Sequence, residues 1–110
     1  MADISMDNDA KNQQFDEDVE KIVELLDEKS YFKARDAILK YNAVDISEIL
    51  EEVLEELGVE KTIIIFRMLP KDVAVEVFSY LPADDQVEIV QGITDREISY
   101  IIKELDLTIR

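Results

Sequence analysis

A 12-residue repeat is the feature of this chain that most constrains its fold. Five consecutive windows, starting at residues 46, 58, 70, 82 and 94, read ISEILEEVLEEL, GVEKTIIIFRML, PKDVAVEVFSYL, PADDQVEIVQGI and TDREISYIIKEL. Positions 5, 8, 9 and 12 of each window have the i, i+3, i+4, i+7 spacing of one helical face. Of these 20 sites 18 are apolar, and the exceptions are Thr62 and Gln86. The repeat predicts one short amphipathic helix per window.

Residues that begin or end helices stand at the window junctions. Gly58 suits the positive-φ position after a helix, and Pro70 and Pro82 suit a first turn, where the missing N–H would have no partner. Two pairs resemble capping boxes at further helix starts: Asp45 with Glu48 and Thr94 with Glu97. Each unit is therefore expected to be a helix of about ten residues followed by a tight turn.

Helices this short are marginally stable alone and must bury their apolar stripes on their neighbours. We therefore expect an all-α fold, a right-handed superhelix of short amphipathic helices with a 12-residue helix-turn repeat. The β-branched run at residues 62–65 has the phase of the other windows, so we interpret it as a helix too. The predicted core consists of Ile65, Val77, Phe78, Leu81, Ile89 and Ile101.

The first part of the chain lies outside the repeat. Residues 1–15 show little periodicity and are interpreted as a mobile acidic tail, followed by one helical domain over residues 16–110. A first helix is expected from Asp16, because Val19, Ile22, Val23 and Leu26 share one helical face. A second is expected at about residues 30–41. It would bury Phe32, Ala37, Ile38 and either Ala34 or the stem of Arg35.

Composition limits the function. The 27 acidic and 12 basic residues give a net charge of −15, which repels nucleic acid and anionic membranes and attracts cations. The chain has no cysteine and no histidine, so it lacks a thiolate metal site, the usual general base near neutral pH and the commonest transition-metal ligand. Carboxylate oxygens remain, and these suit magnesium and calcium. We expect no enzymatic activity.

No targeting or membrane segment is visible. The first residues are polar and acidic, unlike a secretory signal. The longest purely apolar run, residues 63–66, is far below the roughly 18 residues that a transmembrane helix needs. We therefore expect a soluble, intracellular piece of protein that does not itself insert into a membrane.

Residues 69–105 resemble the intracellular N-terminal domain of MgtE-type magnesium transporters. The resemblance lies in the phrase L-P-x-x-x-A-x-E-V-F-x-x-L, which starts at Leu69, and in the two helices that follow. It implies a domain on the cytoplasmic face of the membrane, followed by a pair of CBS domains and the transmembrane pore of a homodimer. Magnesium between this domain and the CBS domains would close the pore. The chain stops at Arg110, at the apparent start of a sixth repeat, so we expect it to come from a longer protein.

The same resemblance suggests the metal ligands. The glutamate of the A-x-E-V phrase is Glu76, and Asp72 lies four residues earlier on the same helical face. Where the family usually has a further acidic pair after the last helix, only Asp106 keeps a carboxylate. For Asp72 and Glu76 a solvated helix face is the alternative interpretation. Other acidic groups are read as helix-start residues or exposed faces: Asp84, Asp85, Glu51, Glu52, Glu55 and Glu56.

A second class of function stays open at this point. Short amphipathic helices with Leu-Pro junctions also occur in the flagellar-motor switch protein FliG and are similar to armadillo-like scaffolds. Such a chain would bind another protein on its concave face, with no need of a metal. The sequence downstream distinguishes the two, since CBS domains and apolar spans would indicate a transporter.

Overall fold

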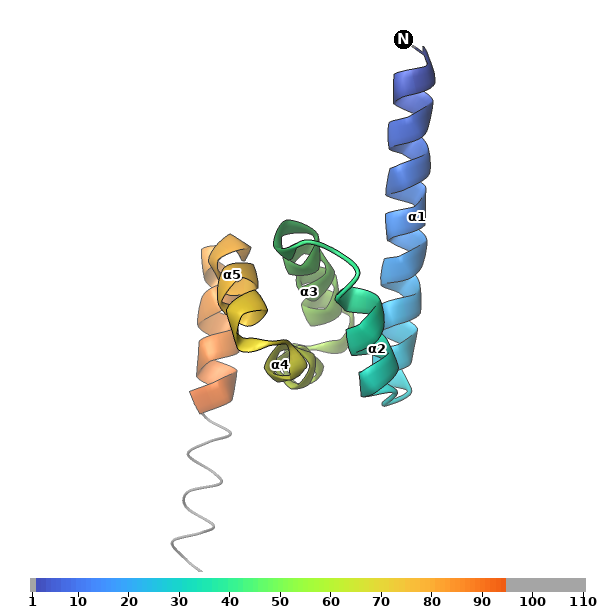
Figure 1. Ribbon diagram of the computed structural model, residues 1–110. Helices are drawn as coiled ribbons and strands as arrows, with labels where there is room; N and C mark the ends of the chain where they lie inside the picture. The colour runs from blue at the N-terminus through green and yellow to red at the C-terminus, as the bar shows by residue number, and fades with distance from the viewer. Residues whose placement is uncertain (1, 95–110) are drawn as a thin grey trace, which may run out of the picture.

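The computed structural model describes residues 2–94, with side chains from residue 12 onward, and every regular element in this range is a helix (Figure 1). The elements are α1 (Ala2–Asp27), α2 (Tyr31–Ile38), α3 (Ala43–Leu57), α4 (Val59–Met68) and α5 (Lys71–Tyr80), followed by a helix at residues 83–94. The all-α prediction is confirmed, and the β-branched run lies in α4 as expected. The right-handed sense of the superhelix stays a prediction.

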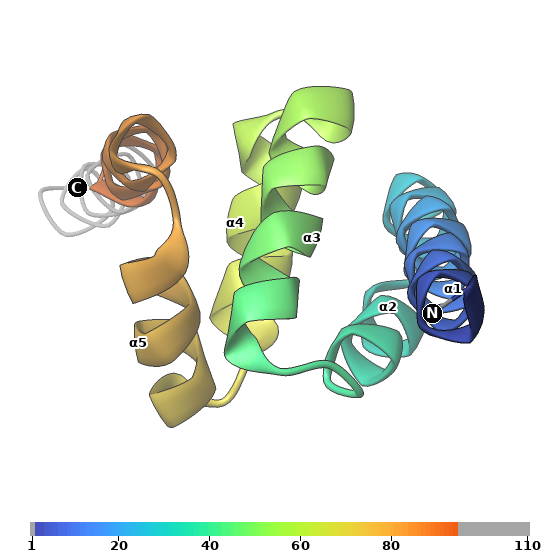
Figure 2. The ribbon, with the colours of Figure 1, turned by 90° about the horizontal axis from the view of Figure 1, so that it is seen from above.

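The helices form a row seen best from above. In Figure 2, α3 and α4 lie together in the middle, the α1–α2 hairpin is on one side, and α5 with the 83–94 helix is on the other. The 12-residue register is visible in the chain itself, because α4, α5 and the last described helix start at residues 59, 71 and 83. Each of the first four repeat units therefore contributes one helix to the row.

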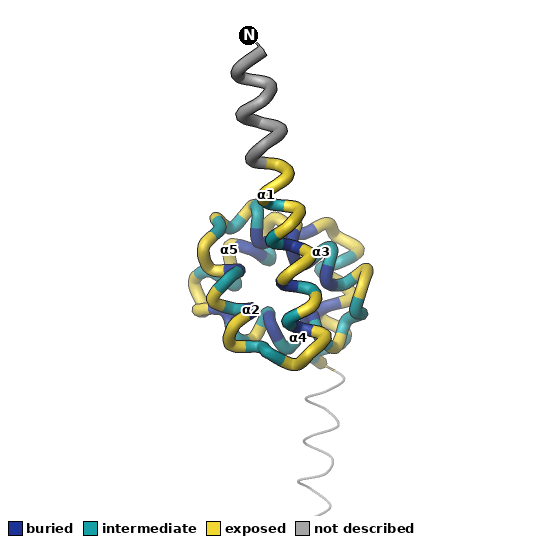
Figure 3. The backbone as a smooth tube through the Cα atoms, turned by 90° about the vertical axis from the view of Figure 1, so that its right-hand side faces the viewer, coloured by how far each residue is buried: buried dark blue, intermediate teal, exposed yellow. Residues whose placement is uncertain are grey.

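Position 8 of the repeat forms the centre of the core. Val53, Ile65, Val77 and Ile89 are all completely buried. Figure 3 shows buried and exposed segments alternating along the helices. Leu81 is also buried, so four of the predicted core residues are confirmed, whereas Phe78 is half-buried and packs against Phe66 with 6.1 Å between ring centroids. Ile101 lies outside the described residues. Position 8 is thus the most reliable core position of the repeat.

The prediction that position 9 faces the core is wrong for the last described helix. Val90 is 49% exposed and its neighbour Val87 is 55% exposed. The buried line of this helix runs through Ile89, and Val90 lies about 100° further round the helix. The apolar residues of the 83–94 helix therefore cover a wider arc of its surface than the arc that is buried.

The two polar exceptions to the repeat both bind backbone carbonyls. The Thr62 hydroxyl donates to the carbonyl of Gly58 at 2.9 Å, and the Gln86 side-chain amide donates to the carbonyl of Phe78 at 2.8 Å. Phe78 lies in the last turn of α5, and its carbonyl also accepts the Leu81 N–H at 3.1 Å. Polar residues at these core-facing sites therefore complete hydrogen bonds at the helix junctions.

Junction residues behave largely as predicted. Gly58 has φ +92° and joins α3 directly to α4, and Pro70 occupies the N-cap of α5. The capping role predicted for Asp45 is wrong, because α3 starts at Ala43, so Asp45 lies inside its first turn. The cap is Asn42, whose side-chain oxygen accepts the Asp45 N–H at 2.9 Å. The Thr94–Glu97 pair extends outside the described residues.

Gly92 has a different role from Gly58. It faces α4, and a Cβ atom at this position would overlap the Cδ1 atom of Ile63 and lie 3.2 Å from Val59 Cγ2. A side chain here would therefore push the 83–94 helix away from α4. The close approach of these two helices depends on the missing side chain.

The N-terminal hairpin departs most from the prediction. α1 begins at Ala2, so residues 2–15 continue the helix that we expected to start near Asp16; their mobility stays a prediction. α2 has only 8 residues, and it buries Ala34 and Ile38. Phe32 is 69% exposed, contrary to expectation, because it lies about 200° from Ala34 around the helix. Its ring instead lies 5.3 Å from the guanidinium carbon of Arg35.

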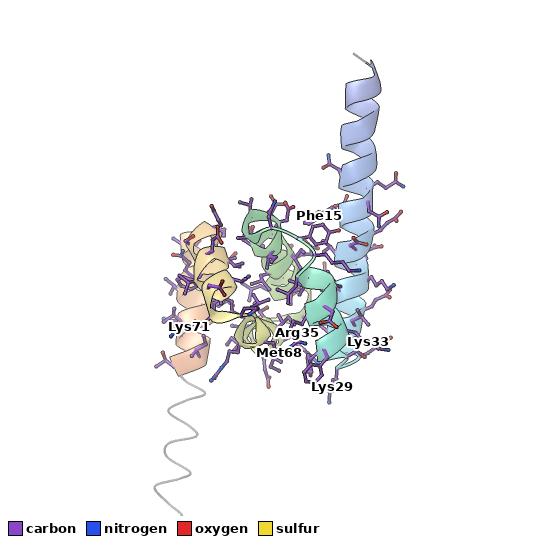
Figure 4. The ribbon with its side chains drawn as sticks, in the orientation of Figure 1. Phe15, Lys29, Lys33, Arg35, Met68 and Lys71 are labelled. Atoms are coloured by element: carbon purple, nitrogen blue, oxygen red, sulfur yellow. The ribbon has the colours of Figure 1, made fainter. Side chains whose placement is uncertain are left out.

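Two polar groups attach this hairpin to the rest of the molecule. Lys61 of α4 donates from Nζ to the carbonyl of Leu26 at 3.2 Å and to the Tyr31 hydroxyl at 3.3 Å. The Tyr41 hydroxyl donates to the Asp18 carboxylate of α1, and the Tyr41 ring meets Phe15 edge-on at 5.3 Å. Phe15 projects from α1 toward α3 in Figure 4. Apolar packing and these hydrogen bonds together position α1.

Candidate functional site

The outer face of α5 carries two of the three residues predicted to bind a metal. Asp72 and Glu76 are both exposed and stand one turn apart, and Val75 beside them is 65% exposed. α5 buries only Val77, because its inner face packs on α3. This leaves the two carboxylates on the solvent side of the row of helices.

Neither carboxylate has a partner among the residues that the structure describes. No hydrogen bond or ion pair involves the side chain of Asp72 or Glu76. The third predicted ligand, Asp106, lies outside this range, so the structure does not bring it to the other two. Among the side chains of residues 12–94, no three acidic groups converge closely enough to hold a metal ion. On its own, this face offers one or two carboxylates and no cage.

A second acidic surface was not predicted as a unit. Glu51 and Glu55 of α3 and Asp85 and Glu88 of the last described helix line one shallow cleft around Leu54. Burial raises the pKa of the Glu51 carboxyl, and the negative charges of Asp85 and Glu48 raise it further. We interpreted these residues separately, as an exposed face and a helix start. The sequence holds no signal that the first and fourth windows are neighbours.

Basic side chains gather elsewhere. A cleft between α1 and α2 is lined by Lys21, Lys33 and Lys40, together with Asp18 and Asp36. Figure 4 shows Lys33 on the side of α2 that faces α1 and Arg35 on the opposite side, toward α4. The lysine-lined cleft and the acidic cleft thus lie on different helices, a separation that the net charge alone does not reveal.

Comparison with known families decides between the two classes of function. The model of the MgtE intracellular N domain matches residues 41–108. The chain belongs to this family. The match starts at Tyr41 and spans α3, α4, α5 and the 83–94 helix, including Asp72 and Glu76. Searches of curated proteins and of solved structures give no match.

Membership of the MgtE N-domain family makes this chain a cytosolic regulatory domain of a magnesium transporter. The family is a regulatory one and not a catalytic one, which agrees with the prediction drawn from composition. Among the described helices, none is long and apolar enough to cross a bilayer. The α1–α2 hairpin precedes the matched residues, so the family match does not account for it.

Proposed function

We propose that this MgtE N domain senses cytosolic magnesium by sharing the ion with the CBS domains of the same transporter. Asp72 and Glu76 on α5 supply carboxylates from one side, and acidic groups of a CBS domain supply the others. Asp106 is a third contributor in this proposal, suggested by the family resemblance. Binding closes the pore of the homodimer when magnesium is abundant.

The observation that carries this proposal is the unpartnered pair of carboxylates on the outer face of α5. Magnesium dehydrates reluctantly, keeps several waters and is usually held by one or two protein carboxylates. A face with two such groups one turn apart fits half of a shared site. The exposed Val75 between them adds an apolar contact for a partner surface.

Charge explains why the shared ion would act as a switch. A domain of net charge −15 repels another acidic surface, and a divalent cation between the two offsets that repulsion. An ion that binds only the closed assembly shifts the equilibrium toward it by its differential affinity. The domain therefore needs only weak affinity for magnesium by itself.

The decisive experiment is Glu76→Gln in the full-length transporter. We expect the magnesium concentration that half-suppresses transport to rise by about fivefold or more, in the range of ordinary allosteric couplings. Glu24→Gln is the matched control, because Glu24 is an exposed helical glutamate on α1, far from this face. Superimposable inhibition curves for the two variants, with normal folding, would remove Glu76 from the sensor.

The isolated chain supplies a second test. Thermal melts in magnesium chloride and in sodium chloride at matched ionic strength should differ only slightly. Micromolar or tighter magnesium binding to this chain alone would contradict a site completed by a partner.

A further inference from the structure

The cleft between α1 and α2 has a charge that contrasts with the rest of the molecule. Residues 21–40 carry five basic and four acidic side chains, so their net charge is +1, while the remaining residues sum to −16. Three of the basic residues, Lys21, Lys33 and Lys40, line the same cleft. An acidic protein would be expected to neutralise such lysines with its many carboxylates.

Among the described residues these three lysines form no direct ion pair, although the charges of Lys40 and Lys21 act on Asp18 from a longer distance. No carboxylate oxygen lies within ion-pair distance of Lys21, Lys33 or Lys40 in the described part of the chain. The hydrogen bonds and the direct ion pair of the two cleft aspartates go to other residues. Asp18 accepts hydrogen bonds from Tyr41 and from Gln14, and Asp36 pairs with Arg35 at 3.5 Å. The three lysines are exposed, so their ammonium groups can donate hydrogen bonds to an added anion.

The geometry points to a binding site for a phosphate-bearing anion in this cleft, with Lys21, Lys33 and Lys40 as its cationic ligands. A lysine ammonium binds phosphate as a compact point charge. The wall formed by α2 is 8 residues long, or roughly 12 Å, which suits a compact group of high charge better than an extended acidic peptide. Leu25 and Ala37 complete the lining and provide apolar contact beside the charges.

The negative net charge does not exclude this site. At physiological ionic strength, charges separated by more than about 8 Å are largely screened, so an anion in the cleft experiences mainly the lining side chains. Two sources of phosphate fit the chemistry: a small phosphate compound, or the headgroup of an anionic lipid. The exposed Phe32 on the same helix would contact the lipid in the second case.

The test is a titration of the ¹⁵N-labelled chain with sodium pyrophosphate, free of magnesium and compensated with sodium chloride to constant ionic strength. We expect saturable NMR shifts confined to residues of α1 and α2 around Leu25 and Ala37. Lys33→Gln with Lys40→Gln should weaken binding by tenfold or more, as expected for loss of charged hydrogen bonds. Lys33 and Lys40 are both exposed, so the double variant should fold.

Controls separate the outcomes. Lys71→Gln removes an exposed lysine of α5 and should bind pyrophosphate like the wild type. Sedimentation with phosphatidylglycerol vesicles, compared with phosphatidylcholine, identifies the lipid headgroup if binding requires Lys33 and Lys40. Absence of binding to both pyrophosphate and vesicles, equal loss in Lys71→Gln, or preference for polyglutamate over pyrophosphate would each overturn the assignment. None of these outcomes depends on the magnesium-sensing proposal.

Discussion

The α1–α2 hairpin and the repeat helices are held in place by different means. Along the repeat, apolar side chains recur every 12 residues, and Val53, Ile65, Val77 and Ile89 form a continuous buried line. The hairpin also buries apolar side chains, but its attachment adds individual polar groups, Lys61 and Tyr41, that occur once each. A periodic interface depends on pattern, whereas a unique interface depends on single residues.

The largest expected effect is in the repeat. Ile65→Ala should lower the free energy of unfolding by about 2–5 kcal/mol, because it opens a cavity at a fully buried position. Val90→Ala is the control at an exposed apolar position of another repeat unit and should cost about 0.5 kcal/mol or less. Urea titration measures both. Similar losses in the two variants would show that position 8 is no more important than position 9.

An intermediate effect is expected at the hairpin. Lys61→Met keeps the apolar stem but removes the hydrogen bonds to the Leu26 carbonyl and the Tyr31 hydroxyl, at a cost of about 1–2 kcal/mol. Hydrogen exchange should become faster in α1 and α2 than in α5, because the hairpin opens separately. Lys71→Met serves as the control. Uniformly faster exchange in all helices would mean that the two regions unfold as one unit.

The smallest effect sharpens the comparison through pH. Tyr41→Phe should cost about 1 kcal/mol near neutral pH, because it removes the hydroxyl that donates to Asp18. Hydrogen bonding from Tyr41 lowers the pKa of Asp18 below its ordinary 3.8, so this contribution is present above pH 4 and lost as the carboxylate is protonated. Burial, followed by the bond to Asp18, raises the pKa of Tyr41 from 10.0 to about 12.

The pKa of Tyr41 shifts upward, so its contribution to stability is lost at high pH and not at low pH. Its contribution is complete below pH 10, where both folded and unfolded forms are protonated, and is lost as the pH rises from 10.0 to about 12. Denaturant titrations of wild type and Tyr41→Phe across pH 3 to 12 should therefore differ most at intermediate pH. A difference that stays constant over the whole range would show that the bond does not contribute to stability.

The sequence predicted the repeat helices better than the α1–α2 hairpin, because only the repeat offers several copies of one pattern. Five repeats of one pattern allowed the phase of α4 to be assigned correctly despite its β-branched residues 62–65. No repetition was available for α2, so the burial of Phe32 was inferred from hydrophobicity alone and was wrong. The capping role of Asp45 was wrong because α3 starts earlier, at Ala43, where Asn42 caps it by accepting the Asp45 N–H.

The sequence predicted which site residues share a helix, but not which helices lie side by side. Local spacing was sufficient to place Asp72 and Glu76 on one helical face. It could not place Asp85 beside Glu51, or Lys21 beside Lys33, because those pairs depend on which helices become neighbours. Charge that looks uniformly acidic in composition is separated by the fold into an acidic end and a basic cleft.

Gly58 carries a consequence of a different kind. Its backbone, with φ +92° and ψ 175°, is close to the mirror image of an extended strand residue, yet nothing lies within 4 Å of where a side chain would start. There is therefore room for the side chain of an L-residue at Gly58, but the backbone conformation disfavours it. At Gly92 the reason for glycine is the opposite, because there the side chain of Ile63 leaves no room. Handedness, and not crowding, therefore restricts the joint at Gly58 to glycine, because a chain built of L-amino acids has no other residue that adopts this conformation readily.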